Sequence, residues 1–117
     1  TYGLKNKLEA ANISNVIPLL AHTGLAKTEL ATTSAAVGGM DANAEFMNMA
    51  QSAEDGATGI IRAAMDPGAK SGDFFGPSGD GWNGFPERLT PEDLLFDESN
   101  IKINWEGCEK AVGKFEV

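Results

Sequence analysis

The chain has a single cysteine, Cys108, and a single histidine, His22, and these two scarcities exclude several kinds of site. One cysteine cannot form an internal disulfide bond or supply a cysteine-rich zinc site. Catalysis that pairs histidine with serine or cysteine would depend entirely on His22, as would a site built from histidine ligands. The sequence therefore indicates a reduced thiol at Cys108 and predicts no metal site.

Basic residues and long apolar runs are also scarce. Nine Lys and Arg residues stand against 17 Asp and Glu residues, which gives a formal net charge of -8 at pH 7. This charge repels the phosphates of nucleic acids and of anionic lipids, so we expect neither as a partner. No apolar run approaches the ~20 residues that a membrane-spanning helix needs, and Thr1 does not begin a signal sequence. An intracellular location is favoured, in the cytoplasm or inside an organelle.

The length of 117 residues and the hydrophobic content of 42% suit one small globular domain. The chain begins without methionine and in the middle of an amphipathic pattern, because Leu4, Leu8 and Ala11 already form one stripe of a helix. We therefore expect residues 1–117 to be a single partial domain of a longer or processed protein.

The apolar run VIPLLA, residues 16–21, is the segment around which the chain is organised. It has the length and composition of a buried parallel strand, and it leads into a turn that contains Gly24. Pro18 cannot donate to a strand ladder, so the regular part of the strand is expected from Leu19. A strand of this kind opens at its carboxyl end onto a binding site.

A helix is predicted from Ala53 to Met65. Ser52 is a suitable N-cap, two acidic residues follow it, apolar residues recur at helical spacing, and the sequence DPG ends the pattern. The sequence SGDFFGP, residues 71–77, then predicts a short aromatic strand. The order strand, helix, strand predicts that Val16–Ala21 and Phe74–Phe75 are neighbouring parallel strands joined by a right-handed crossover.

The remaining segments carry weaker signals. Residues 29–39 consist mostly of small residues, which indicates a mobile segment with some helix, and loop sequence is expected from residue 78 to residue 91. The letters GDGWNG, residues 79–84, match the dinucleotide fingerprint G-x-G-x-x-G. That fingerprint needs a helix to begin at its last glycine, and the sequence predicts none, so a surface loop is expected.

Three stretches resemble the short-chain dehydrogenases/reductases. The sequence AHTGLAKT, residues 21–28, resembles the family's His-Pro-Gly-x-x-x-Thr turn, with Thr23 in place of proline. The helix that begins AEDGA, residues 53–57, is similar to an A-x-x-x-A helix of the family. The sequence WEGCEKAVG, residues 105–113, resembles the closing W-x-x-S-E-x-x-x-G helix of retinol-dehydrogenase-like members, with Cys108 in place of serine. The resemblance extends from Leu4 to Gly113.

This resemblance implies an α/β fold, namely the C-terminal part of a doubly wound, Rossmann-like parallel sheet with two strands and flanking helices. It implies NAD or NADP as the cofactor of the complete protein, with Thr28 touching its nicotinamide end. The residues implied are the cofactor turn His22, Gly24, Leu25 and Thr28, and the substrate loop Leu30, Phe46, Met47 and Met49. Two alternatives stay open: the turn is a strand exit without a ligand, and the apolar loop residues simply pack, since methionine fills gaps wherever it falls.

The implied activity is hydride transfer between NAD(P) and a small-molecule carbonyl or alcohol. The family's nucleotide-binding glycine motif and Tyr-x-x-x-Lys are absent here, because Tyr2 is followed four places later by Asn6. Tyr2 is therefore interpreted as a packing residue, and no catalytic residue is expected in this segment. The alternative is a non-catalytic, dehydrogenase-derived subunit of a larger assembly. In either case the remaining dehydrogenase chain or a partner subunit should cover the sheet edge. A stand-alone binding module unrelated to the family would be indicated by a structure without parallel strands.

Overall fold

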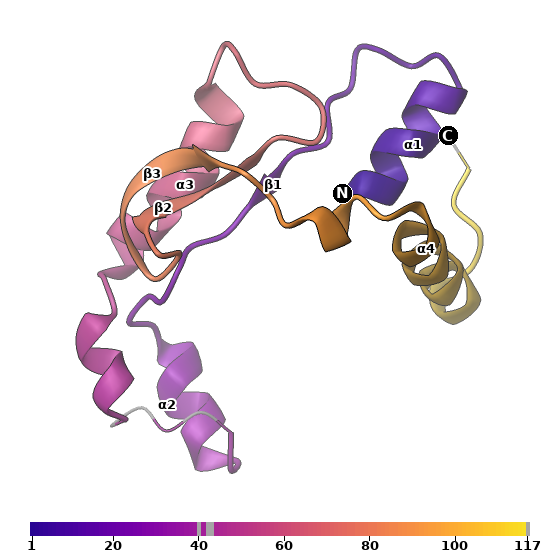
Figure 1. Cartoon of the computed structure of the whole chain (residues 1–117). Helices are drawn as coiled ribbons and strands as arrows, with labels where there is room; N and C mark the ends of the chain where they lie inside the picture. Colours follow the sequence, from indigo (N-terminus) through magenta and orange to yellow (C-terminus); the bar gives the residue numbers. More distant parts are fainter. Residues whose placement is uncertain (40, 42–43, 117) are drawn as a thin grey trace. The chain divides into compact units, whose positions relative to one another are not determined.

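The computed structural model describes residues 1–39, 41 and 44–116 (Figure 1). In chain order the elements are α1 (Tyr2–Ala10), β1 (Leu20–Ala21), α2 (Glu29–Ala36), the 3-10 helix η1 (Glu45–Met49), α3 (Ala53–Met65), β2 (Phe74–Gly79), β3 (Asn83–Leu89), the 3-10 helix η2 (Asp93–Leu95) and α4 (Glu98–Val112). The chain divides into two compact units: unit 1 is Thr1–Leu20, Gly68–Phe74 and Thr90–Val117, and unit 2 is Ala21–Pro67 and Phe75–Leu89. None of the described helices has both the length and the hydropathy that crossing a lipid bilayer requires.

The fold is α/β, with a mixed three-stranded sheet in the order β1-β2-β3. β1 runs parallel to β2, and the amide of Leu20 donates to the carbonyl of Asp73 at 2.9 Å. α3 joins these two strands and spans Ala53–Met65. The structure thus confirms the predicted parallel pair and the helix between its strands.

The first strand is shorter than the sequence predicts. Only Leu20 and Ala21 are regular strand, whereas Val16 and Ile17 are about half exposed. The carbonyl of Pro18 accepts from the amide of Gly72 at 2.8 Å, but its ring nitrogen has no hydrogen to donate. The ladder therefore becomes regular only beyond the proline, one residue later than expected.

The loop expected for residues 78–91 is wrong, because half of this segment forms β3 and its first two residues end β2. Asp80 and Gly81 both have positive φ, at 48° and 79°, which lets the chain reverse between β2 and β3. The amide of Trp82 donates to the carbonyl of Gly79 at 2.9 Å and closes the turn. The glycines of the G-x-G-x-x-G match thus serve a β-hairpin, and no helix begins there, which confirms the rejection of the dinucleotide fingerprint.

α3 begins at the predicted cap and packs on the sheet. The Ser52 hydroxyl accepts from the amide of Asp55 at 3.0 Å. Gly56 and Gly59 are buried, and a Cβ added at Gly59 would lie 3.0 Å from the carbonyl oxygen of His22. Glycine at this position therefore allows the close approach of helix and sheet, although it lowers the helix propensity by about 1 kcal/mol relative to alanine.

Ionic and polar contacts connect the end of α3 to β3. The carboxylate of Asp66 lies 3.4 Å from the guanidinium of Arg88 and 3.8 Å from that of Arg62. The guanidinium of Arg62 also donates to the carbonyl of Pro86. Each of these partly exposed ion pairs contributes about 0–1 kcal/mol, so they orient the helix more than they stabilise it.

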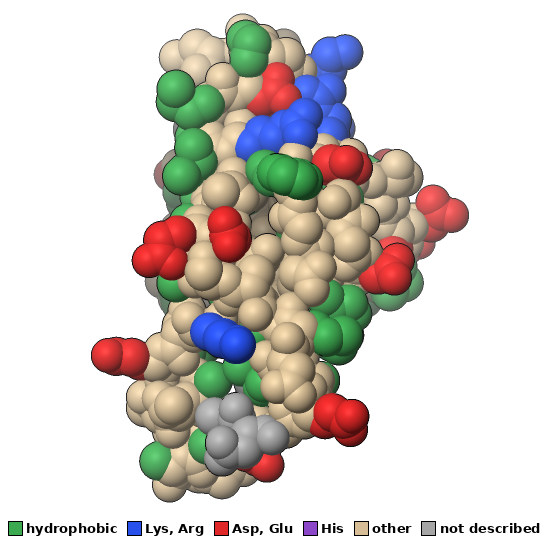
Figure 2. Space-filling model, turned by 90° about the vertical axis from the view of Figure 1, so that its left-hand side faces the viewer, with side chains coloured by type: hydrophobic (Ala, Val, Ile, Leu, Met, Phe, Trp, Pro, Cys, Tyr) green, Lys and Arg blue, Asp and Glu red, His purple; other side chains and the backbone are tan. Residues whose placement is uncertain are grey.

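Few apolar side chains are buried in either unit. Of the described residues, the buried apolar side chains are Tyr2, Leu8 and Pro18 in unit 1 and Ala31, Met47, Ala63, Phe75 and Pro77 in unit 2. On α3, by contrast, Ile60 is 52% exposed, Ile61 is 58% exposed and Met65 is 75% exposed. Figure 2 shows hydrophobic side chains reaching one surface between acidic side chains. Unpartnered apolar surface of this kind invites association.

Residues 1–117 expressed alone are expected to associate and not to fold as a well-packed monomer. The physical reason is the exposed apolar face of α3 together with the edge position of β1 in the sheet. Size-exclusion chromatography and thermal unfolding test this. The double variant Ile61→Lys, Met65→Lys should associate less, since it charges the same face. A wild-type monomer peak with a sharp cooperative transition would contradict the expectation.

Candidate functional site

The turn after β1 is held by backbone hydrogen bonds from two distant segments. The amide of Leu25 donates to the carbonyl of Trp82 in the hairpin turn at 2.7 Å. The amide of Gln51 donates to the carbonyl of Leu25, and the amide of Lys27 donates to the carbonyl of Gln51, both at 2.9 Å. These last two bonds form an isolated parallel bridge centred on Ala26 and Gln51. The carboxyl end of β1 is therefore fixed where the sequence predicted a site.

His22 and Gly24 give the turn its local shape. The Nδ1 atom of His22 accepts from the amide of Gly24 at 3.1 Å, which requires Nδ1 to be unprotonated. Gly24 has φ of +63°, and a Cβ there would lie 2.5 Å from the carbonyl oxygen of Trp82. A glycine is therefore required at this position both by its backbone conformation and by the close hairpin. Both residues act as supports of the turn.

Thr28 lies where the turn becomes α2. It is the N-cap residue, with φ of −135° and ψ of 168°, and its side chain makes no capping hydrogen bond. An open cleft of about 800 Å³ lies beside it, between α2, η1 and the start of α3. The residues lining the cleft are Lys27, Thr28, Glu29, Ala31, Thr32, Ala44, Met47, Asn48 and Ala53. The exposed hydroxyl of Thr28 and the amides of Glu29 and Leu30 are thus available to a polar group in this cleft, whereas the amide of Ala31 donates to the carbonyl of Thr28.

The structure brings together one residue from each predicted group, Thr28 of the cofactor turn and Met47 of the substrate loop. Met47 is buried and belongs to the cleft wall. Leu30 and Phe46 are exposed and lie outside the described lining of this cleft. Met49 lines a separate hollow of about 500 Å³, which it shares with Gln51 and the hairpin. The predicted loop residues therefore occupy different surfaces.

Sequence reasoning missed two amide side chains that secure the turn. The Nε2 of Gln51 donates to the carbonyl of Thr23 at 2.7 Å, and its Oε1 accepts from the amide of Gly84 at 3.2 Å. The Nδ2 of Asn83 donates to the carbonyl of Met49 at 2.8 Å. All three bonds join positions about 30 residues apart, so no local pattern could have revealed them.

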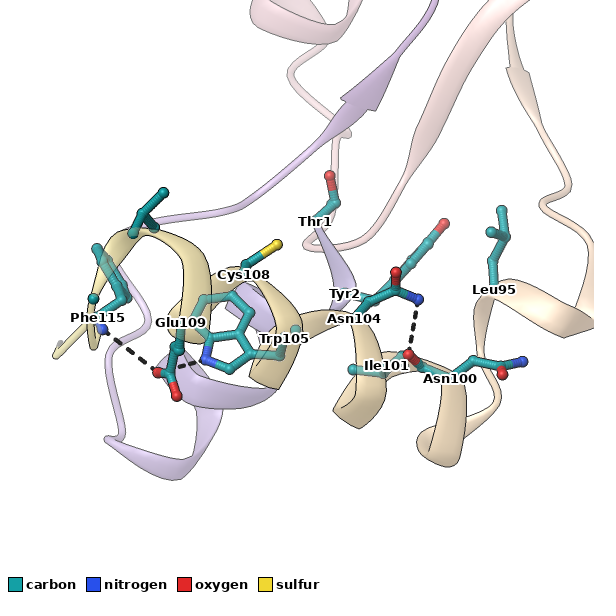
Figure 3. Close-up of a pocket in the computed structure, with 13 residues that line it drawn as sticks. Thr1, Tyr2, Leu95, Asn100, Ile101, Asn104, Trp105, Cys108, Glu109 and Phe115 are labelled. Carbon is teal, nitrogen blue, oxygen red and sulfur yellow. Dashed lines mark hydrogen bonds between the residues drawn. The ribbon is translucent and has the colours of Figure 1, made fainter.

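A second cavity, of about 430 Å³, lies within unit 1 beside α1 and α4 (Figure 3). Its wall includes Tyr2, whose ring packs on Phe96 at a centroid distance of 4.9 Å, and the exposed thiol of Cys108. The Tyr2 hydroxyl is buried without a hydrogen-bond partner in the described part of the chain. Its pKa is raised by burial and by the charge of Asp73. This packing agrees with the interpretation of Tyr2 as a structural residue.

Glu109 is fixed at the wall of the same cavity. Its carboxylate accepts from the indole Nε1 of Trp105 at 2.7 Å and from the amide of Phe115 at 3.5 Å (Figure 3). The ammonium of Lys7 lies 3.4 Å away. The Trp105 hydrogen bond is the main cause of a lowered pKa of Glu109, and the Phe115 amide and Lys7 add to it. The contacts of this carboxylate thus serve the packing of α4 on α1.

No protein-family profile, curated protein or solved structure matches this chain. The described residues also contain no group of three or more His, Cys, Asp or Glu side chains placed to hold a metal ion. A functional assignment therefore depends on the residues of the turn, the cleft beside Thr28 and the topology that places them.

Gly76→Ala is expected to destabilise the protein by about 1–3 kcal/mol, because the new methyl group would overlap the His22 ring and lie 2.9 Å from Leu89. Gly107→Ala is the matched control. Gly107 lies inside α4 with nothing within 4 Å of an added Cβ, so alanine there should stabilise the helix by up to about 1 kcal/mol. Thermal unfolding of the complete protein measures both changes. Equal effects of the two substitutions would show that β2 does not pack against His22.

Proposed function

We propose that this chain is the C-terminal part of an NAD(P)-dependent short-chain dehydrogenase/reductase of the retinol-dehydrogenase-like kind. The observation that carries the proposal is the turn at the carboxyl end of β1, which leads to Thr28 and to a cleft shared with Met47. Binding sites of doubly wound sheets lie at this end of parallel strands. α3 connects the parallel strands β1 and β2, as a crossover helix does in such a sheet. Further strands of the sheet would pair with the free edge of β1.

The residues at the cleft fit the nicotinamide end of a dinucleotide. The hydroxyl of Thr28 is not engaged in a cap bond, so it can donate to or accept from an amide group. The amides of Glu29 and Leu30, at the first turn of α2, add donors at the same place. Ala31 and Met47 give the cleft an apolar wall that suits an aromatic ring. When bound, NAD(P) supplies or accepts the hydride.

The residues of this chain bind and orient, and they do not transfer protons. In the proposed enzyme the proton donor and acceptor groups come from the rest of the protein. Thr28 holds the ring end of the cofactor, and the apolar cleft wall at Met47 borders the substrate. This wall would limit the access of water to the reacting carbon.

The exposed face of α3 favours a second candidate, the dehydrogenase-derived subunit without catalysis. Ile60, Ile61 and Met65 require a covering surface, and this surface can belong to another subunit as well as to the same chain. The intact mass of the protein as isolated separates the two. A mass near 12.3 kDa favours the subunit, whereas a mass about two- to threefold larger favours a whole doubly wound enzyme.

Thr28→Val is expected to weaken NAD(P)H binding to the complete protein. Loss of one hydrogen bond costs about 0.5–1.5 kcal/mol, which corresponds to an increase in Kd of about two- to thirteenfold. Thr33→Val is the matched control, since Thr33 is an exposed residue of the same helix outside the cleft lining. Fluorescence titration with NADH and NADPH measures both. Equal affinities for the two variants and the wild type would remove Thr28 from the site.

A further inference from the structure

Gln51 is the residue on which the turn, the cleft segment and the hairpin converge. Its backbone amide and carbonyl bond to Leu25 and Lys27, and its side chain bonds to Thr23 and Gly84. Thr23, Leu25 and Lys27 are alternate residues of the turn that leads to Thr28. Gln51 therefore holds the edge of the turn that these three residues form. Its side chain also bonds to the backbone of the hairpin at Gly84.

The side-chain chemistry at position 51 is specific. The carboxamide donates through Nε2 to the carbonyl of Thr23 at 2.7 Å and accepts through Oε1 from the amide of Gly84 at 3.2 Å. A neutral amide provides a donor and an acceptor on one planar group. An ionised carboxylate would keep the acceptor for Gly84 but would place a negative charge against the carbonyl of Thr23. A thioether would lose both bonds while keeping the length of the side chain.

Gln51 also closes the base of the segment that borders the cleft. Because the amide of Lys27 donates to the carbonyl of Gln51, the two ends of the segment between these residues are held together. The bond from Asn83 to the carbonyl of Met49 ties the returning end to the hairpin at 2.8 Å. Movement at position 51 would thus shift the turn and the segment together.

We propose that Gln51 is a positioning residue of the nucleotide site: its carboxamide holds the turn in the geometry in which Thr28 faces the cofactor. This inference depends on the proposed function, because the ligand that Thr28 contacts is taken from it. Thr23 stands at the position where the short-chain dehydrogenases/reductases have proline. The Gln51 bond restrains the backbone of Thr23 from outside and so takes over a restraint that a proline ring would supply from within.

The test compares Gln51→Met and Gln51→Glu with the wild type in the complete protein, by titration with NADH and NADPH at pH 5 and pH 8. Gln51→Met should raise Kd at least fivefold at both pH values. Gln51→Glu should raise it similarly at pH 8 and by a smaller factor at pH 5, because a larger fraction of the introduced carboxyl is then protonated, and the protonated form donates toward Thr23 while it keeps an acceptor for Gly84. Asp55 lines the same hollow, and its charge favours that protonation.

Ser52→Ala is the matched control for a purely structural effect. Ser52 is the adjacent residue and caps α3 by accepting from Asp55, but it does not bond to the turn. This variant should lower the midpoint of thermal unfolding while its Kd stays within twofold of the wild type at both pH values. The inference is overturned if Gln51→Met binds nucleotide as the wild type does. It is also overturned if Gln51→Glu shows no recovery at pH 5 relative to the wild type.

Amide hydrogen exchange separates failure of this inference from failure of the proposed function. If the wild type binds neither NADH nor NADPH, the proposed function fails. The exchange of Lys27 and Gly84 in Gln51→Met then decides the positioning role: faster exchange of both amides supports it, and unchanged exchange overturns it.

Discussion

The close approach of α3 to the parallel strands is the constraint on which the rest of unit 2 depends. A Cβ at Gly59 would lie 3.0 Å from the carbonyl oxygen of His22 and 3.6 Å from the Cα of Gly76. Helix and strands therefore meet backbone to backbone, with little side-chain volume between them. This contact sets the distance between β1 and the start of α3, and it brings Gln51 within hydrogen-bond reach of the turn.

The sequence predicted the elements whose signals are local. Ser52 and the sequence DPG marked both ends of α3, so its bounds are those observed, and the order of elements predicted that β1 and β2 are parallel. β3 was missed, since Phe85 is exposed and a proline follows it, which leaves no alternating apolar pattern. This strand is specified by the preceding turn at Asp80 and Gly81 and by its pairing with β2.

The candidate site was predictable only in part, because only some of its signals are local in the sequence. The end of a buried strand and the glycine after it indicated where a site lies, and Thr28 and Met47 do line one cleft. The residue that holds this cleft in place, Gln51, has no sequence signature, because its partners are defined by the folded chain alone. Thr23 illustrates the limit: threonine lacks the fixed φ of a proline ring, and a hydrogen bond from a distant residue restrains its backbone instead.

The bridge at Ala26 and Gln51 has a consequence for how readily the chain tolerates changes in length. Because the ends of the segment from residue 28 to residue 50 are already held together, inserted residues add only to loop-closure entropy. Doubling the length of a flexible loop costs about 0.6 kcal/mol, which is less than one typical hydrogen bond at its base. Insertions and deletions between the two anchors can therefore alter the shape of the cleft wall while the strand, the turn and Thr28 keep their positions.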